Sequence, residues 1–296
     1  MLPHSTNSNH AFPSSEEGDL TPQLTDSQYL LNNSFKEVER RKTMHTIYHY
    51  ILGKKFMAPM EEGLNQGITD IAESYPKSII VGIQLDGYKI RDDIPNNLSI
   101  AKCNVDNPLP FPISTFDFVF IRCACCGVLK TTWPNFLLEL KRVLKPGGYL
   151  EWFEPEHKFR GGPCSARFSE DVIRHMDDVG YNSNLAQETR YLLTAAGFGT
   201  VQHHGITIPV GPLWDEVVAR AFSNKYHIAM QNMKDTMSTA WRISPEEYDQ
   251  KMNAVVHEWN HVYKTHLNHT ISIVRKPFDG INIDDPSIKL HSIEND

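Results

Sequence analysis

The chain has 296 residues, of which 40% are hydrophobic and 22% are charged, as in ordinary globular proteins. Its 29 lysines and arginines are outnumbered by 36 aspartates and glutamates, and the net charge of −7 argues against a nucleic-acid partner held by a basic surface. The sequence has no apolar run of about 18 residues and no basic, apolar secretion signal at its start, so we expect no membrane partner. We expect an intracellular protein of the cytoplasm or the nucleus.

Both ends of the chain are polar. Residues 1–26 are rich in Ser, Pro, Asn and Asp and have few large apolar side chains, so burial cannot offset the entropy lost on ordering them. Residues 279–296 have a similar composition. We therefore predict a disordered N-terminal tail at 1–26, a folded domain at 27–278 and a C-terminal tail at 279–296.

Between the tails, segments of helical periodicity alternate with short apolar runs typical of buried strands. In chain order we expect a helix at 35–52, strands at 78–83, 98–101 and 116–121, a helix at 133–144 and a strand at 149–153. These are followed by a helix at about 185–196, a strand at about 200–208, helices near 213–231 and 245–265, and a strand at 270–274. The alternation predicts a mostly parallel sheet that is covered on both faces and binds ligands at the carboxyl ends of its strands.

The strand at 116–121, the helix at 133–144 and the strand at 149–153 form one predicted packing unit. Their apolar stripes point at each other, and we expect the core to contain Phe116, Phe118, Val119, Phe120, Leu137, Leu140, Leu144, Leu150 and Trp152.

The stretch from Leu109 to Glu151 carries the most specific motifs. It reads Leu-Pro-Phe-Pro at 109–112, Ser-Thr-Phe-Asp-Phe-Val at 114–119 and Arg-Val-Leu-Lys-Pro-Gly-Gly at 142–148. The Lys-Pro-Gly-Gly run predicts a helix stop followed by a tight turn. The doubly apolar strand before it is typical of the centre of a sheet. These motifs resemble the core of the class I AdoMet-dependent methyltransferases.

The resemblance extends over residues 29–277 to fungal methyltransferases of the secondary-metabolism-regulator type. It rests on Tyr29-Leu30, Glu39-Arg40, His45, Ala196-Gly197-Phe198, Ile208-Pro209-Val210-Gly211 and Glu246-Glu247-Tyr248. It implies an α/β, doubly wound, Rossmann-like sheet of seven strands, with a helical cap at about 213–265 inserted between the last two strands. It also implies methyl transfer from S-adenosyl-L-methionine (AdoMet) to a small molecule or a protein.

Two departures from the family concern the AdoMet site. The family's first strand, at the centre of the sheet, and its glycine-rich turn should precede Gly67, but the sequence there lacks the residues to form them. Those glycines let the backbone approach the cofactor closely. Gln84 replaces an acid that, in the family, accepts hydrogen bonds from both ribose hydroxyls. A shortened gene model and a real loss both explain the missing turn, whereas a skipped exon does not explain Gln84.

The resemblance places four residues at the cofactor: Gly67, Gln84, Asn104 and Arg122. Asn104 matches the position at the adenine edge, although an ordinary turn asparagine is the simpler alternative. Arg122 follows a strand and either faces the cleft or lies on the surface. No catalytic residue is assigned, because methyl transfer needs mainly in-line positioning.

Glu154, Glu156 and His157 follow the strand at 149–153 and could border the methyl acceptor. We expect at least two of these three side chains to be surface groups.

A cysteine cluster at Cys123, Cys125 and Cys126 resembles part of a metal site. A zinc site built from cysteine pairs would need a second pair, and only Cys103 and Cys164 remain. We therefore expect free, half-buried thiols and no metal ion.

Residues His257, Glu258 and His261 satisfy the H-E-x-x-H pattern of zinc metallopeptidases. The apolar stripe of the predicted helix, which includes Met252 and Trp259, leaves the histidine pair on the solvent side, with no third ligand at the family's spacing. Three functions therefore follow from the sequence. The favoured one is an AdoMet-dependent methyltransferase, the second is a degenerate relative with a regulatory role and a protein partner, and the remote third is a zinc metallopeptidase.

Overall fold

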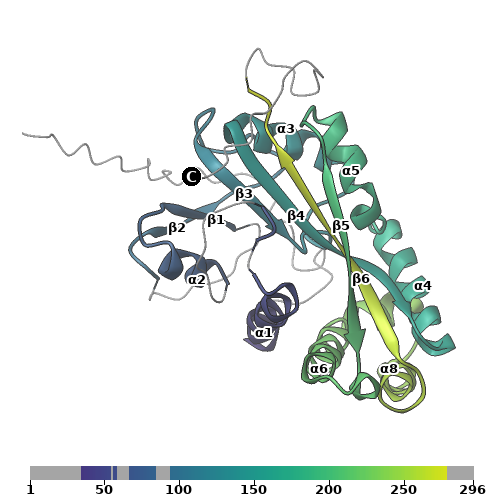
Figure 1. Ribbon diagram of the computed structural model, residues 1–296. Coiled ribbons are helices and arrows are strands. Elements are labelled where there is room, and N and C mark those ends of the chain that lie inside the picture. Colours follow the sequence, from purple (N-terminus) through teal and green to yellow (C-terminus); the bar gives the residue numbers. More distant parts are fainter. Residues whose placement is uncertain (1–34, 55, 59–66, 85–93, 279–296) are drawn as a thin grey trace, which may run out of the picture.

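The computed structural model describes residues 35–54, 56–58, 67–84 and 94–278, and Figure 1 shows the fold that they form. The tails predicted at 1–26 and 279–296 lie outside the described residues. No helix in the described ranges combines the length and the apolar character that crossing a membrane would require.

The six strands in the described part of the chain form two sheets. In the smaller sheet, β1 (Ile80–Gln84) runs parallel to β2 (Leu98–Lys102). The larger sheet has the order β3-β4-β6-β5, with β3 (Phe116–Arg122) parallel to β4 (Leu144–Arg160). Its last two strands, β5 (Gln202–Val210) and β6 (Thr265–Arg275), are antiparallel to each other, and β6 is antiparallel to β4.

The division into two sheets corrects the expected position of β3. The sequence predicts it at the centre of a continuous sheet, but in the described residues it is an edge strand. The family strand that would join β1 to β3 is the one that the sequence lacks before Gly67. The hydrogen-bonding edge of β3 is therefore left without a strand from the described part of the chain.

The core prediction is confirmed for the helix and for β4 but is wrong for β3. Leu137, Leu140, Leu144, Leu150 and Trp152 are at most 3% exposed. The predicted β3 side chains Phe116, Phe118, Val119 and Phe120 are only half-buried, because β3 lies at an edge. Phe56 packs against Phe118 and Phe120 with ring centroids 4.8 and 4.9 Å apart, and so covers one face of that edge.

Helices cover the larger sheet and close one of its ends. In Figure 1, α3 (Trp133–Val143), α4 (Pro163–Asp178) and α5 (Leu185–Ala195) lie along one side of the sheet. Three helices between β5 and β6 form the predicted cap: α6 (Val217–Asn232), α7 (Lys234–Trp241) and α8 (Pro245–His257). The N-terminal helix α1 (Phe35–Leu52) packs against α6, and α2 (Gly67–Ser74) packs against β1. The α/β fold with an inserted helical cap is confirmed.

The structure differs from the predicted elements at three places. Helix α4 was not predicted, although Gly162-Pro163 is a typical helix start and Phe168, Val172 and Met176 then recur every fourth residue on its buried side. The last helix ends at His257, earlier than predicted. It is followed by a π-turn at Glu258–Val262 and by β6, which begins at Thr265. β4 begins at Leu144, so the Pro-Gly-Gly run lies within the strand and forms a bulge. Gly147 in this bulge adopts a left-handed φ of 76°.

Candidate active site

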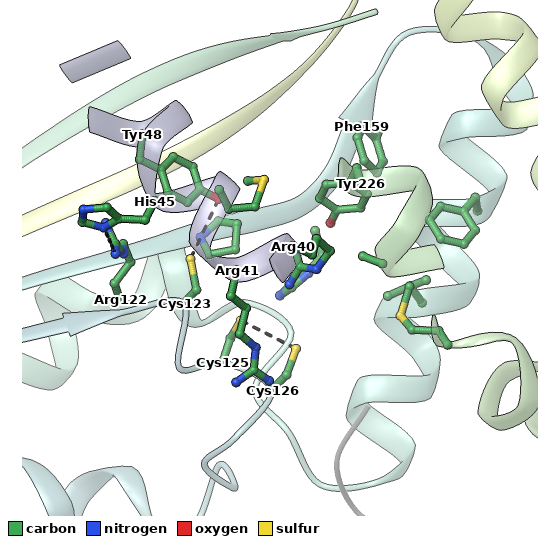
Figure 2. Close-up of a pocket in the computed structure, with 17 residues that line it drawn as sticks. Arg40, Arg41, His45, Tyr48, Arg122, Cys123, Cys125, Cys126, Phe159 and Tyr226 are labelled. Atoms are coloured by element: carbon green, nitrogen blue, oxygen red, sulfur yellow. Dashed lines mark hydrogen bonds between the residues drawn. The ribbon is translucent and has the colours of Figure 1, made fainter. Parts of the chain in front are cut away.

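A cavity of about 310 Å³ lies at the carboxyl ends of β3 and β4. Helix α1 covers it on one side and α6 of the cap on another, so its walls come from segments far apart in sequence (Figure 2). Two arginines of α1, Arg40 and Arg41, contribute positive charge, whereas Phe159 and Tyr226 contribute aromatic surface. The arrangement combines an apolar interior with a cationic rim, which suits a small ligand or a single inserted side chain.

Arg122 ends β3 and lines this cavity, so it faces the cleft and is not a surface residue. Its guanidinium hydrogen-bonds Nδ1 of His45 and lies 5.8 Å from the ring centroid of Tyr48. Burial lowers the pKa of Arg122. These contacts join the end of β3 to helix α1, which is how α1 is held over the cavity.

Tyr48 lies at the centre of a neutral polar network beneath α1. Its hydroxyl accepts a hydrogen bond from the Cys123 thiol at 3.9 Å and pairs with Nε2 of His269 at 3.2 Å. Burial raises the pKa of Tyr48 and lowers the pKa of His269 to about 3, so both side chains are neutral at physiological pH. The network fixes α1 against β6 without burying a charge.

Glu154 is fully buried, so it is not one of the surface groups expected among Glu154, Glu156 and His157. It accepts hydrogen bonds from the backbone N–H of Ala124 at 2.8 Å and of Cys125 at 3.4 Å, and from the indole of Trp152 at 2.9 Å. Burial raises the pKa of Glu154 to about 7. The carboxylate thus holds the turn after β3, where Cys123 adopts a left-handed φ of 53°.

The other two groups predicted beside the acceptor differ from each other. His157 lines the cavity, and burial lowers its pKa to about 4. Glu156 forms an ion pair with Arg160 on the same strand and does not line the cavity. Of the three, therefore, only His157 borders the space where an acceptor would bind.

Three of the predicted cofactor residues, Gln84, Asn104 and Arg122, lie at or just after the carboxyl ends of strands. Gln84 is the last residue of β1 and is paired in register with Lys102 at the end of β2. Asn104 follows β2, is exposed, and accepts a hydrogen bond from the backbone N–H of Asp106 at 2.9 Å. This is the geometry of an ordinary turn asparagine. Gly67 is the first residue of α2, and residues 59–66 and 85–93 lie outside the described residues.

The H-E-x-x-H residues have a structural role. Glu258 is buried and accepts hydrogen bonds from the backbone N–H of Cys164 and Ser165, each at 2.8 Å, at the start of α4. His257 and His261 are exposed, as the apolar stripe predicted. Because Glu258 satisfies the orphan donors of a helix N-terminus, it is not available as the base of a peptidase.

Tyr48 and Tyr226 line the cavity but were not predicted to do so. Both lie on helices whose buried faces also contain core residues, so periodicity alone does not distinguish a cavity-lining tyrosine from a packed one. The only available signal was the concentration of polar side chains on α1, where Arg40, Arg41 and His45 interrupt the apolar positions.

Comparison with known proteins identifies the same region. The methyltransferase domain family matches residues 65–151, a stretch that contains Gly67, Gln84, Asn104 and Arg122. The chain is 24% identical over 235 residues to the secondary metabolism regulator laeA of Aspergillus flavus, covering 69% of this chain and 62% of the relative. It is 24% identical over 239 residues to the N-methyltransferase sirN of Leptosphaeria maculans, covering 75% and 82%. The protein-methionine methyltransferase laeA of Emericella nidulans is 20% identical over 232 residues, covering 69% and 61%.

Two solved structures show a distant likeness. Phosphoethanolamine N-methyltransferase 2 of Haemonchus contortus in complex with S-adenosyl-L-methionine is 17% identical, with a TM-score of 0.43 and coverage of 82% of this chain and 60% of that one. The [4+2]-cyclase SpnF is 17% identical, with a TM-score of 0.39 and coverage of 68% of each chain.

Proposed function

We propose that the chain, which is similar to class I methyltransferases and to the fungal laeA-like proteins, transfers a methyl group from AdoMet to an acceptor bound in the cavity. The observation that carries this proposal is the position of the cavity. It lies at the carboxyl ends of β3 and β4 and is closed by α1 and the cap. Ligands of open α/β sheets bind at this edge.

The residues at that edge fit AdoMet in part. A polar residue stands at the end of each of the three strands. Gln84 is the last residue of β1, Asn104 follows β2, and Arg122 is the last residue of β3. Gln84 offers a neutral acceptor where a carboxylate would form charge-assisted hydrogen bonds, which are about twice as strong as neutral ones. We therefore expect AdoMet to bind, with reduced affinity.

When bound, AdoMet supplies a methyl group on a positively charged sulfur. This chain's own residues position the acceptor and exclude water from it. Phe159 and Tyr226 provide apolar walls, while Arg40 and Arg41 provide positive charge at the rim. A cationic rim favours an acceptor molecule that carries a negative group. Two relatives are named as an N-methyltransferase and a protein-methionine methyltransferase, so the acceptor atom is a nitrogen or a sulfur of a small molecule or a protein.

The test is transfer of label from methyl-labelled AdoMet at millimolar concentration into the small-molecule and protein fractions of a fungal extract. The variant Arg122→Gln keeps the size of the side chain but removes the charge inside the cavity, whereas Lys145→Gln removes a charge outside it. We expect transfer by the unmodified chain and by Lys145→Gln, and at least a tenfold loss in Arg122→Gln. Absence of transfer, or equal transfer by both variants, would contradict the proposal.

A second function, a binding or regulatory protein without turnover, is favoured by one observation. The sheet is divided between β1–β2 and β3, at the place where the family's central strand would lie. Under this alternative the cavity retains its ligand, in place of an acceptor, and AdoMet binding is lost. Thermal stabilisation by extract metabolites together with none by AdoMet would support the alternative over methyl transfer.

A further inference from the structure

Three potential metal ligands meet on the wall of the cavity. Sγ of Cys125, Sγ of Cys126 and a ring nitrogen of His157 all lie within 4.8 Å of one another. The two cysteines come from the turn after β3, and the histidine comes from the distal half of β4. The expectation of no metal ion rested on the lack of a second cysteine pair. The structure supplies a histidine from another strand in its place.

The spacing of the sulfurs fits zinc. The two Sγ atoms are 3.8 Å apart. Two thiolates of a tetrahedral site, each about 2.3 Å from zinc, are separated by about 3.8 Å. Sulfur and imidazole nitrogen are the donors that zinc prefers, and two cysteines with one histidine form a known set for sites that keep an open position.

His157 is the observation that points independently to a ligand. Its Nε2 is buried and has no hydrogen-bond partner among the described residues. A buried polar atom without a partner is costly, and such atoms in native proteins have a functional explanation or an unseen ligand. A neutral imidazole keeps a free lone pair on one ring nitrogen, and this is the atom that binds a metal ion.

The surroundings hold the ligands in place and balance the charge. Glu154 accepts the N–H of Cys125, which joins the cysteine turn to the strand that carries His157. Two thiolates neutralise the charge of a divalent ion. Figure 2 shows the side chain of Arg41 directed toward Cys125 and Cys126.

We propose that Cys125, Cys126 and His157 bind one zinc ion, with its fourth position open to the cavity. Binding replaces the two thiol protons, which pass to solvent. The site lies beside the proposed acceptor space but does not depend on AdoMet, so it can exist whether or not the chain transfers methyl groups.

The test uses the full chain, purified without a histidine tag and kept under a phosphine reductant. Zinc affinity is measured by competition with a chromogenic chelator, and Co²⁺ loading is followed through its thiolate charge-transfer absorption. We expect one ion per chain and a thiolate–cobalt band. The variants Cys126→Ser and His157→Gln should each weaken zinc binding by about 100-fold or more, since even loss of an outer partner costs 10- to 100-fold.

Matched controls separate this site from other thiols and histidines. Cys103→Ser and Cys164→Ser change half-buried thiols outside the cluster, and His257→Gln changes an exposed histidine at the end of α8. All three should bind zinc like the unmodified chain. Substoichiometric zinc, a cobalt spectrum without a thiolate band, or equal losses in cluster and control variants would overturn the proposal. Circular dichroism of each variant shows that a loss does not come from unfolding.

Discussion

The two sheets differ in size and in how many buried side chains stabilise them. The larger sheet contains the fully buried side chains of Trp152 and Phe153, and the equally buried Trp133 lies on α3, which covers the sheet. The helices around this sheet also close a cavity. The smaller sheet has two strands of five residues each, and Ile79 beside β1 is 77% exposed. The larger sheet is thus continuous and its helices enclose the cavity, whereas no strand in the described residues joins the smaller sheet to it. The cavity and the cofactor edge are separable parts of the fold.

The largest expected difference between the two sides is in stability. Leu140, which is 3% exposed, supports the larger sheet, and Leu140→Ala should lower the free energy of unfolding by ~2–5 kcal/mol, as large-to-small core changes do. Leu138 on the same helix is 51% exposed, so Leu138→Ala should cost less than about 0.5 kcal/mol. In β1, Ile83→Ala should cost no more than about 1 kcal/mol, because Ile83 is 36% exposed. Urea unfolding measures all three, and equal costs for the two leucines would contradict the packing of α3.

The next effect concerns the cofactor side. Inserting a strand and a Gly-x-Gly-x-Gly turn before Gly67, together with Gln84→Asp, should restore backbone contacts and charge-assisted ribose hydrogen bonds. These contacts should make the free energy of AdoMet binding more favourable by ~2–4 kcal/mol, which tightens binding by ~30- to 1000-fold. Thermal shift at a fixed AdoMet concentration measures it. The matched control carries the same insertion with valines in place of the glycines, and an equal shift in that control would show that the turn is not the missing part.

A pH effect tests how tightly α1 closes the acceptor side. The ordinary histidine pKa is 6.5, whereas burial lowers that of His269 to about 3. Below pH 6.5 the unfolded chain gains a proton that the folded chain does not, so stability falls as the pH falls. His269→Gln removes this dependence, and between pH 7 and pH 5 the unfolding free energy of the variant should improve by about 2 kcal/mol relative to the unmodified chain. Parallel pH profiles for the two proteins would mean that water reaches His269.

The smallest effect separates the two roles of Asn104. Asn104→Ala removes the acceptor for the Asp106 N–H and should cost about 0.5 kcal/mol of stability, because the turn is exposed. Asn104→Asp keeps that acceptor but loses the amide donor. If Asn104 contacts the adenine edge, the aspartate variant keeps its stability and loses AdoMet affinity. If both variants bind AdoMet like the unmodified chain, Asn104 is a turn residue only.

The features that could be predicted are those encoded by residues close together in the sequence. Periodicity and the Lys-Pro-Gly-Gly run are local signals. They correctly placed α3 and predicted helices between β5 and β6, but they missed α7 and extended the last helix beyond His257. The edge position of β3 was not predicted, because the sequence of an apolar strand does not distinguish an edge strand from a central one. The cavity was predicted only through Arg122 and His157, since Tyr48, Tyr226 and the partnering of Glu154 depend on contacts between residues far apart in sequence.

The affinity of the unmodified full chain for AdoMet tests the central claim most directly. Equilibrium dialysis from micromolar to millimolar AdoMet, with Gln84→Asp in parallel, gives both dissociation constants. We expect a sub-millimolar constant for the unmodified chain and roughly tenfold tighter binding for Gln84→Asp, because one charge-assisted hydrogen bond adds about 1.5 kcal/mol. A micromolar constant that Gln84→Asp leaves unchanged would contradict a weakened cofactor side. Absence of binding in both proteins would contradict methyl transfer itself.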